Sequence, residues 1–151
     1  MPAKKGYRNT MMKLLIDTNV IIDYLADRAS FAEHSEKIIE LCADGEVKGF
    51  LSASSVTDIY YILRKTLGKQ KAREGLRALL DAVNIADVGR KDLLGAMELE
   101  MADFEDALVS VCAKRNKAAY IVTRNVKDFS GSSVEAITPK DLLKRFFPYL
   151  V

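Results

Sequence analysis

The sequence predicts an α/β fold, a three-layer sandwich in which a mostly parallel central sheet of about five strands is flanked by helices. Short apolar runs that suit buried parallel strands alternate with segments whose apolar residues recur at helical spacing. Glycines end two of the helical segments, at Gly45 and Gly68, and Pro139 opens another. No repeat, low-complexity tract or linker interrupts this alternation, which is typical of βαβ units.

Length and composition restrict the classes of protein to which this chain can belong. The 151 residues suit one domain, which would bury about 70% of its unfolded surface. Hydrophobic residues make up 49% of the chain, and no apolar run approaches the roughly 20 residues of a membrane span, so we expect no membrane segment. Residues 1–10 are basic and lack a signal-peptide core, so we expect a flexible arm followed by a single domain over residues 11–151. The net charge of +2 is too small to predict a nucleic-acid partner by itself.

Residues 13–25, KLLIDTNVIIDYL, combine a strand with the start of a helix. The apolar run at residues 14–16 predicts a strand buried on both faces, and Asp17 follows at its carboxyl end. Ligand crevices of open α/β sheets lie outside such ends, so Asp17, Thr18 and Asn19 are candidates for chemistry. These residue types are also preferred helix N-caps, and this stretch alone leaves capping and function equally open.

The next elements are a helix and a strand. A capping-box pattern at Ser30 and Glu33 predicts a helix that ends at Gly45. Residues 47–51 then have the apolar content of a second strand.

Two helices are expected after the second strand. The first carries Asp58 in its first turns and ends at Gly68. Its cap would be one of three serines, Ser52, Ser54 or Ser55. Residues 69–82 form the second, amphipathic helix, with three leucines on its core face: Leu76, Leu79 and Leu80.

The last part of the chain contains three more strands. They are expected at residues 84–88, 119–123 and 134–137, of which the last is the weakest. Helices are expected at residues 91–99 and 103–116, and a final helix begins at Thr138 with proline at its first position.

A second group of acids lies near the start of the expected helix at residues 103–116. Asp103 and Asp106 project from one face of this helix, and Ser110 continues that face one turn later. Acids in a first turn favour the helix dipole by about 0.3–1 kcal/mol, and we assign Glu105 to that role. Asp106 is flanked by apolar residues, so its carboxylate needs a cation or donors to offset desolvation. Function is therefore favoured for Asp106 and stays open for Asp103.

The fourth expected strand delivers polar residues to its carboxyl end. Thr123, Arg124 and Asn125 lie there, and Asp128 follows closely. If the strand order reverses between the first and fourth strands, their carboxyl ends meet at the crevice of a doubly wound sheet. We expect the acids of both segments to meet there.

Cysteine and histidine usage narrows the chemistry. Cys42 and Cys112 lie in helix-like patterns without a CxxC pair, which predicts free, buried thiols in a reducing cytoplasm. His34 is the only histidine and lies on an expected surface helix, which disfavours a Ser-His-Asp triad and removes His-rich metal sites. Any catalytic site must therefore rest on carboxylates.

Four features together resemble the PIN-domain ribonucleases. They are an apolar run ending in DTN, an acid early in the helix after the second strand, a DxxDA pattern and a strand ending in TRNxxDF. The most specific part is residues 105–129, EDALVSVCAKRNKAAYIVTRNVKDF. The resemblance covers nearly the whole chain after the basic arm.

The resemblance implies a nuclease in which three or four acids hold one or two Mg²⁺ or Mn²⁺ ions. Asp17 matches the family's first acid, Asp58 the second and Asp106 the third, and Asn125 matches the fourth position. These four residues are the expected catalytic residues. A site rich in carboxylates and poor in His and Cys is also what Mg²⁺ selects.

Two positions depart from the family's pattern. The second acid is usually Glu, so Asp58 is one methylene shorter, and Asn125 keeps an oxygen ligand without the usual charge. Asp103 or Asp128 would make up the missing charge. The expected metal ligands are therefore Asp17, Asp58, Asp103, Asp106 and Asp128.

Substrate contacts are expected around these acids. Thr18, Asn19 and Thr123 would support the metal ligands or contact phosphates, and Arg124 would contact a phosphate. Tyr60 and Tyr61 are candidates for base stacking, although at least one is expected in the core. A basic run predicts either an RNA-binding face or a solvated helix surface; between Arg64 and Arg77 it comprises Lys65, Lys69, Lys71 and Arg73, opposed only by Glu74.

Small PIN proteins of this length resemble VapC-type toxins of toxin–antitoxin pairs. That resemblance implies RNA cleavage, a homodimer and a cognate antitoxin whose carboxyl-terminal segment blocks the site. The alternative is a non-catalytic PIN-fold module that binds RNA or protein, which Asp58 and Asn125 favour. A phosphotransfer enzyme that uses Asp17 is a weaker alternative, because phosphatases of the haloacid dehalogenase type place a second Asp where Asn19 stands.

Overall fold

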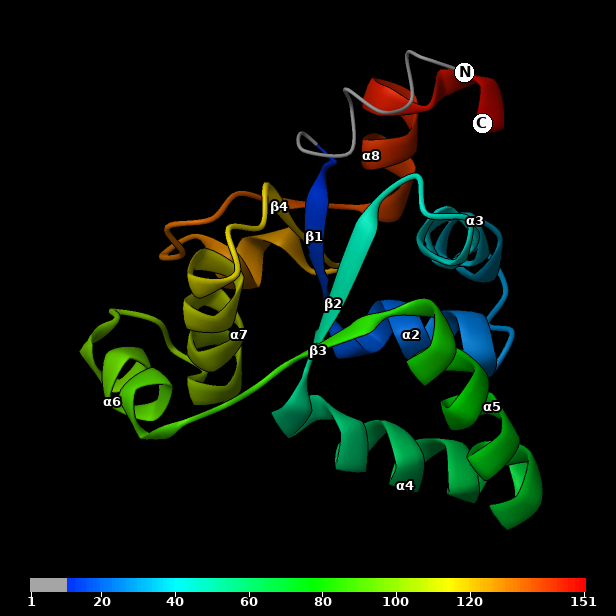
Figure 1. The fold of residues 1–151 in the computed structure, drawn as a ribbon, viewed down its shortest axis with the longest axis horizontal. Helices are drawn as coiled ribbons and strands as arrows, with labels where there is room; N and C mark the ends of the chain where they lie inside the picture. Colours follow the sequence, from blue (N-terminus) through cyan, green and yellow to red (C-terminus); the bar gives the residue numbers. More distant parts are fainter. Residues whose placement is uncertain (1–10) are drawn as a thin grey trace.

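A computed structural model describes residues 11–151, and its centre is a five-stranded sheet (Figure 1). The strands are β1 (Lys13–Ile16), β2 (Lys48–Ser52), β3 (Asn84–Ala86), β4 (Tyr120–Val122) and β5 (Ala136–Ile137). They lie in the order β3-β2-β1-β4-β5, and every pairing is parallel. The predicted fold class is therefore confirmed. Because the order turns back at β1, the carboxyl ends of β1 and β4 are neighbours, as the sequence predicted.

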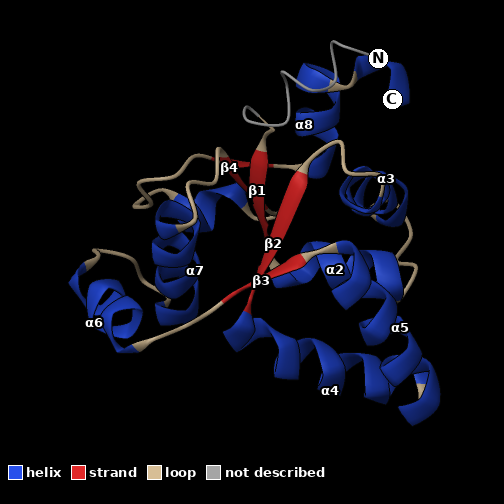
Figure 2. Ribbon diagram, in the orientation of Figure 1, coloured by secondary structure: helices blue, strands red, loops and turns tan. Residues whose placement is uncertain are grey.

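Helices cover both faces of this sheet (Figure 2). The core on one face is shared with α2 (Thr18–Leu25), α3 (Ala32–Ala43), α4 (Val56–Leu67), α5 (Lys69–Ala82) and α8 (Pro139–Phe146). The other face is covered by α6 (Arg90–Glu98) and α7 (Phe104–Arg115). Short 3₁₀ helices lie at η2 (Ala53–Ser55), η3 (Val126–Phe129) and η4 (Pro148–Leu150). None of the helices within residues 11–151 has the length and apolar content needed to cross a membrane.

Strand β1 shows how the sequence builds both cores. Leu14 and Ile16 pack into the core that contains α2 and α3, whereas Leu15 packs into the core under α7. All three side chains are at most 1% exposed. Burying each of them contributes about 1.5–3 kcal/mol to the free energy of unfolding. The strand that ends at Asp17 is thus held from both faces.

Gly49 in β2 lets α3 approach the sheet closely. A Cβ atom at this position would lie 2.6 Å from the Cys42 Sγ atom and 3.1 Å from the Ile16 Cδ1 atom. Cys42 and Cys112 are both free and buried, as predicted. Burial raises the pKa of the Cys42 thiol to about 12, so this side chain is a packing group and not a nucleophile.

Two helix starts differ from the sequence prediction. Ser30 does not cap α3, because its φ of 73° turns the chain into the left-handed region and Phe31 takes the cap position without a side-chain bond. The serines before α4 do not cap it either. Ser54 and Ser55 lie in η2, and the hydroxyl of Ser54 lies 2.7 Å from that of Ser52 at the end of β2, so these two serines bond each other.

Strand lengths and one core residue also differ. β3 ends at Ala86 and β5 begins at Ala136, so both are shorter than predicted. Both are edge strands, which have only one neighbour to bond. Leu80, expected in the core, is 42% exposed. The predicted basic arm, residues 1–10, lies outside the described residues.

Candidate active site

The carboxyl ends of β1 and β4 open into a hollow of about 460 Å³, here called the acidic hollow. Its acids come from the end of β1, the first turn of α4, the start of α7 and η3: Asp17, Asp58, Asp103, Glu105, Asp106 and Asp128. Asn125, which follows β4, lines it as well, and Arg28 is the cation among its lining residues. The structure thus brings together every residue that the sequence predicted as a catalytic residue or metal ligand.

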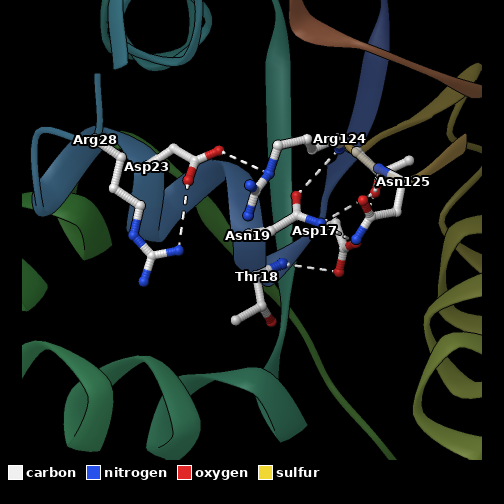
Figure 3. Close-up of polar contacts among 8 residues, drawn as sticks. Asp17, Thr18, Asn19, Asp23, Arg28, Arg124 and Asn125 are labelled. Atoms are coloured by element: carbon white, nitrogen blue, oxygen red, sulfur yellow. Dashed lines mark hydrogen bonds and ion pairs between the residues drawn. The ribbon is translucent and has the colours of Figure 1, made fainter. Parts of the chain in front are cut away.

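Asp17 is held in place by hydrogen bonds at both of its oxygens (Figure 3). Its Oδ1 atom accepts from the Thr18 backbone N–H at 2.8 Å, and its Oδ2 atom accepts from Thr123 Oγ1 at 2.8 Å and Asn19 Nδ2 at 3.3 Å. Burial raises the pKa of Asp17, although the bonds from Thr123 and Thr18 oppose that shift. Asp17 both caps α2 and lines the acidic hollow, so capping and function do not compete here.

The segments that follow β1 and β4 are bonded to each other. Asn19 Oδ1 accepts from the Arg124 backbone N–H at 3.2 Å, and Thr123 Oγ1 accepts from the Asn125 backbone N–H at 3.1 Å. Thr123 is fully buried, so its hydroxyl supports Asp17 and does not face a substrate. The expected phosphate contact of Thr123 is therefore not matched by its placement, whereas Thr18 and Asn19 do line the acidic hollow.

Asp103 and Asp106 begin α7 in different roles. Asp103 Oδ1 accepts from the Asp106 backbone N–H at 2.9 Å, so Asp103 is the N-cap of the helix. The Asp106 side chain is half-buried in the acidic hollow. Desolvation, together with the charges of Asp103, Asp17 and Asp128, raises the pKa of Asp106 to about 7. A carboxylate in this environment gains more from a nearby cation than a solvated one does.

Glu105 is a site residue that the sequence analysis missed. It lines the acidic hollow with Asp58, and burial, with the charge of the Asp58 carboxylate, raises its pKa. The helix-dipole role assigned to Glu105 is therefore incomplete. The available signal was the short side chain of Asp58, which leaves room for a longer acid from a neighbouring helix.

Arg124 and Asp23 form a polar cluster beside the acidic hollow (Figure 3). Asp23 on α2 is 1% exposed; its Oδ2 atom lies 3.2 Å from Arg124 Nε, and its Oδ1 atom lies 3.7 Å from Arg28 Nη1. The Arg124 Nε–H group is not aligned for a hydrogen bond, so its contact with Asp23 is an ion pair. The Arg124 guanidinium also lies over the Phe31 ring, 4.5 Å from its centroid. Arg124 thus lies next to the acidic hollow and not in its lining, and its phosphate contact stays a prediction.

Other predicted features lie at or beyond the rim of the acidic hollow. Tyr61 is 62% exposed and lines the hollow, whereas Tyr60 packs against the core, as expected for one of the pair. Ser110 is buried, and its hydroxyl lies 2.6 Å from Ser132 Oγ, so it does not reach the acids. The basic residues of α5 are exposed and line no part of the acidic hollow: Lys69, Lys71 and Arg73.

The chemistry of the acidic hollow fits a divalent cation. Its acids and Asn125 offer oxygen atoms, the donors that suit Mg²⁺ and Mn²⁺. Burial, and after it the charges of neighbouring acids, raises the pKa values of Asp17, Glu105 and Asp106, and a nearby cation would oppose both effects. Within residues 11–151, no three acidic, His or Cys side chains converge closely enough to hold an ion.

The family of the chain follows from its sequence. The model of the PIN domain family matches residues 13–127, from β1 into η3. The chain belongs to the PIN domain family. The matched span contains each acid of the acidic hollow except Asp128, which follows it directly.

Known proteins are similar to this PIN domain over most of their own length. Ribonuclease VapC1 of Aquifex aeolicus is 27% identical over 139 residues, which cover 89% of this chain and 95% of that protein. VapBC2 from Rickettsia felis, bound to a promoter DNA fragment, has a TM-score of 0.68 at 18% identity, over 84% of this chain and 98% of that one. VapC20 of Mycobacterium tuberculosis, a sarcin-ricin loop cleaving toxin, has a TM-score of 0.58 at 12% identity, over 72% and 86% of the two chains. The likeness to these solved structures confirms the predicted PIN-type fold.

Proposed function

We propose that this PIN domain is a divalent-metal-dependent endoribonuclease that hydrolyses RNA phosphodiester bonds as the toxin of a toxin–antitoxin pair. The observation that carries the proposal is the acidic hollow, where Asp17 is held by Thr123 and the pKa of Asp106 is raised to about 7. The names of two similar proteins, a ribonuclease and a sarcin-ricin loop cleaving toxin, support RNA as the substrate.

In this proposal the ion is held mainly by Asp17, whose carboxylate is oriented by hydrogen bonds, and by Asp106, whose pKa burial and neighbouring acids raise to about 7. Glu105 compensates for the short side chain of Asp58, and Asp128 supplies the charge that Asn125 lacks. Mg²⁺ or Mn²⁺, when bound, would activate a water and neutralise the charge that develops on the scissile phosphate.

The chain's own residues position the RNA around these acids. The hydroxyl of Thr18 and the amide of Asn19 lie on the first turn of α2 and line the hollow, so both can contact the phosphate. The exposed ring of Tyr61 at the rim offers a face on which a base can stack. Thr123 keeps Asp17 oriented through its 2.8 Å hydrogen bond.

We also infer an antitoxin partner, a homodimer and a reducing, cytoplasmic compartment. A toxin–antitoxin complex from Klebsiella pneumoniae shares the fold, with a TM-score of 0.63 at 22% identity over 83% of this chain and 97% of that one. The exposed apolar side chains Leu94, Met97 and Phe104 on α6 and α7 offer a face for a second subunit. The two free, buried thiols suit a reducing compartment.

Cleavage of a fluorescently labelled single-stranded RNA by the purified protein tests the activity. We expect cleavage with Mg²⁺ or Mn²⁺, none with EDTA, and none with Asp106→Asn. Asp44→Asn is the matched control, because Asp44 is an exposed acid outside the hollow. RNA that is bound but stays intact with either metal would favour the non-catalytic PIN module, which Asp58 and Asn125 support.

The added ligand has a test of its own. Glu105→Gln should lower the cleavage rate by about 10- to 100-fold, the usual effect of losing a group that supports a metal ligand. Glu98→Gln, an exposed acid on α6, is the control. If Glu105→Gln cleaves RNA at an unchanged rate, Glu105 does not support the metal site, and its only role is to interact with the dipole of α7.

A further inference from the structure

A second hollow, of about 260 Å³, lies at the Asp23–Arg124 cluster and is called here the Phe31 hollow. Its walls are mostly apolar and come from α2, the start of α3 and the start of α8. Besides Asp23 and Arg124, its lining includes Phe31, His34 and Ser35. None of the roles proposed above uses this space.

The Phe31 hollow and the acidic hollow each share lining residues with a third hollow, of about 540 Å³. Asn125 and Asp128 line it together with the acidic hollow, and Arg124 and Thr138 line it together with the Phe31 hollow. Asp17 and Asp23 are six residues apart on α2, or about 9 Å along the helix axis. A nucleotide beside the scissile phosphate can therefore reach the Phe31 hollow.

Three buried polar atoms of residues that line the Phe31 hollow lack a hydrogen-bond partner among the described residues. Arg124 Nε is ion-paired with Asp23, which leaves Ser35 Oγ and Asp23 Oδ1, on two side chains that are each 1% exposed. The Arg28 guanidinium lies 3.7 Å from Asp23 Oδ1, which is too far for a hydrogen bond. Buried polar groups are nearly always paired in folded proteins, so these two point to a ligand that pairs with them.

The rest of the wall suits a flat aromatic ligand better than a phosphate. The Phe31 ring is 42% exposed and carries the Arg124 guanidinium 4.5 Å from its centroid. Aromatic rings and guanidinium planes are the groups on which unpaired RNA bases stack. A phosphate would find the charge of Arg124 already paired with Asp23, and the carboxylate of Asp23 would repel it.

We propose that the Phe31 hollow binds one unpaired RNA base next to the cut site and that Asp23 and Ser35 select a base with an exocyclic amino group over uracil. An amino N–H can donate to Asp23 Oδ1, whereas the matching position of uracil is a carbonyl oxygen that the carboxylate repels. Ser35 Oγ can donate to or accept from a ring atom beside the amino group. The inference rests on the proposed ribonuclease function and adds the site that determines which RNA sequence is cut.

Titration of the isotope-labelled full-length protein with nucleoside 5′-monophosphates, without divalent metal, tests the hollow directly. The adenosine, cytidine and guanosine nucleotides should shift the amide signals of Phe31, Ser35 and Arg124. The uridine nucleotide should bind at least about fivefold more weakly, the low end of discrimination by a base-edge contact. Absence of shifts with all four, or shifts confined to the acidic hollow, would overturn the proposal.

Two variants separate stacking from hydrogen bonding. Phe31→Ala should weaken nucleotide binding by roughly 5- to 150-fold, the range measured for loss of a stacking ring. Ser35→Ala should weaken it by about two- to tenfold without lowering thermal stability, because the hydroxyl it removes is unpaired. Phe146→Ala is the matched control, since that ring is 38% exposed and lines none of the three hollows. Equal effects of Phe31→Ala and Phe146→Ala would contradict the assignment.

Cleavage of a random-sequence RNA pool separates this inference from the function on which it rests. Wild-type protein should disfavour uracil at one position beside the cut, and Phe31→Ala should lose that preference while still cutting. If wild-type protein leaves RNA intact but nucleotides still shift Phe31 and Ser35, the nuclease proposal fails and the base site stands. If RNA is cut with a preference that Phe31→Ala leaves unchanged, the base site fails and the nuclease stands.

Discussion

Two aspartates on one short helix distinguish the two neighbouring hollows. Asp17 caps α2 in a hollow lined by five further acids, and burial raises its pKa. Asp23, six residues later, is buried between two arginines, Arg28 and Arg124. Burial raises the pKa of Asp23 as well, but Arg124 and Arg28 oppose that shift, whereas Asp17 forms no ion pair with any residue among 11–151. The surroundings of Asp23 therefore suit recognition of a neutral base, and those of Asp17 suit a metal ion.

The largest expected effect follows from neutralising one acid in each hollow. Asp106→Asn should lower RNA cleavage by at least about 100-fold, the scale of losing one preorganised electrostatic group, and should raise the free energy of unfolding of the metal-free protein at pH 8. Asp23→Asn should instead lower the free energy of unfolding by about 1–3 kcal/mol, because its partner arginines lose a charged acceptor. Urea unfolding and cleavage rates measure both. Equal losses of stability in the two variants would remove the distinction between the hollows.

Stabilisation by a divalent metal should depend on the acids of the acidic hollow and not on Asp23. At a concentration about 100 times its dissociation constant, Mg²⁺ or Mn²⁺ should stabilise the wild type by about 2.7 kcal/mol. The double change Asp17→Asn and Asp106→Asn should abolish this thermal shift while leaving the far-UV spectrum intact. Asp23→Asn should keep the shift, since Asp23 does not line the acidic hollow. A shift that survives the double change would place the ion elsewhere.

The stability of the metal-free protein should depend on pH through the acidic hollow. Burial and neighbouring acids raise the pKa of Asp106 from 3.8 to about 7, so the folded state binds this proton more tightly than the unfolded state. The free energy of unfolding should therefore fall as the pH rises from about 4 to about 7. Asp106→Asn should flatten the profile in urea unfolding with EDTA. A profile that this change leaves as steep would show that other groups cause it.

Asp92 provides an internal reference for the pH experiment. The pKa of Asp92 is lowered by the hydrogen bond from the Gly89 backbone N–H and by Arg115. Its contribution therefore has the opposite sign and is lost as the pH falls below the ordinary range of an aspartate. Asp106→Asn should leave this loss of stability at low pH unchanged.

The smallest expected effect concerns the path of the RNA between the two hollows. Each phosphate neutralised on a single strand contributes about −0.7 to the slope of log affinity against log salt concentration. Changing Lys127 and Lys140 to Gln should reduce that slope by about 1.4, because Lys127 lines the third hollow and Lys140 the Phe31 hollow. The triple change of the exposed α5 cations to Gln should leave the slope unchanged: Lys69, Lys71 and Arg73. A reduction of about 2 in the triple variant would show instead that RNA also runs over α5.

The sequence by itself determined the order of the elements and the acids that end them. The apolar run before Asp17 and the glycine after α4 are local patterns, and burial and turn geometry act on them wherever they lie. The meeting of Asp17 with Asp106 could also be expected, because parallel strands and right-handed crossovers leave few topologies open.

Only the tertiary structure decided which way the polar side chains turn. Glu105 extends the acidic hollow beside Asp58, and Arg124 leaves it for Asp23 and Phe31. These partners come from segments far apart in the sequence, and no local pattern records their distances. A buried charge takes the nearest partner that offsets its desolvation, and packing alone determines which partner is near.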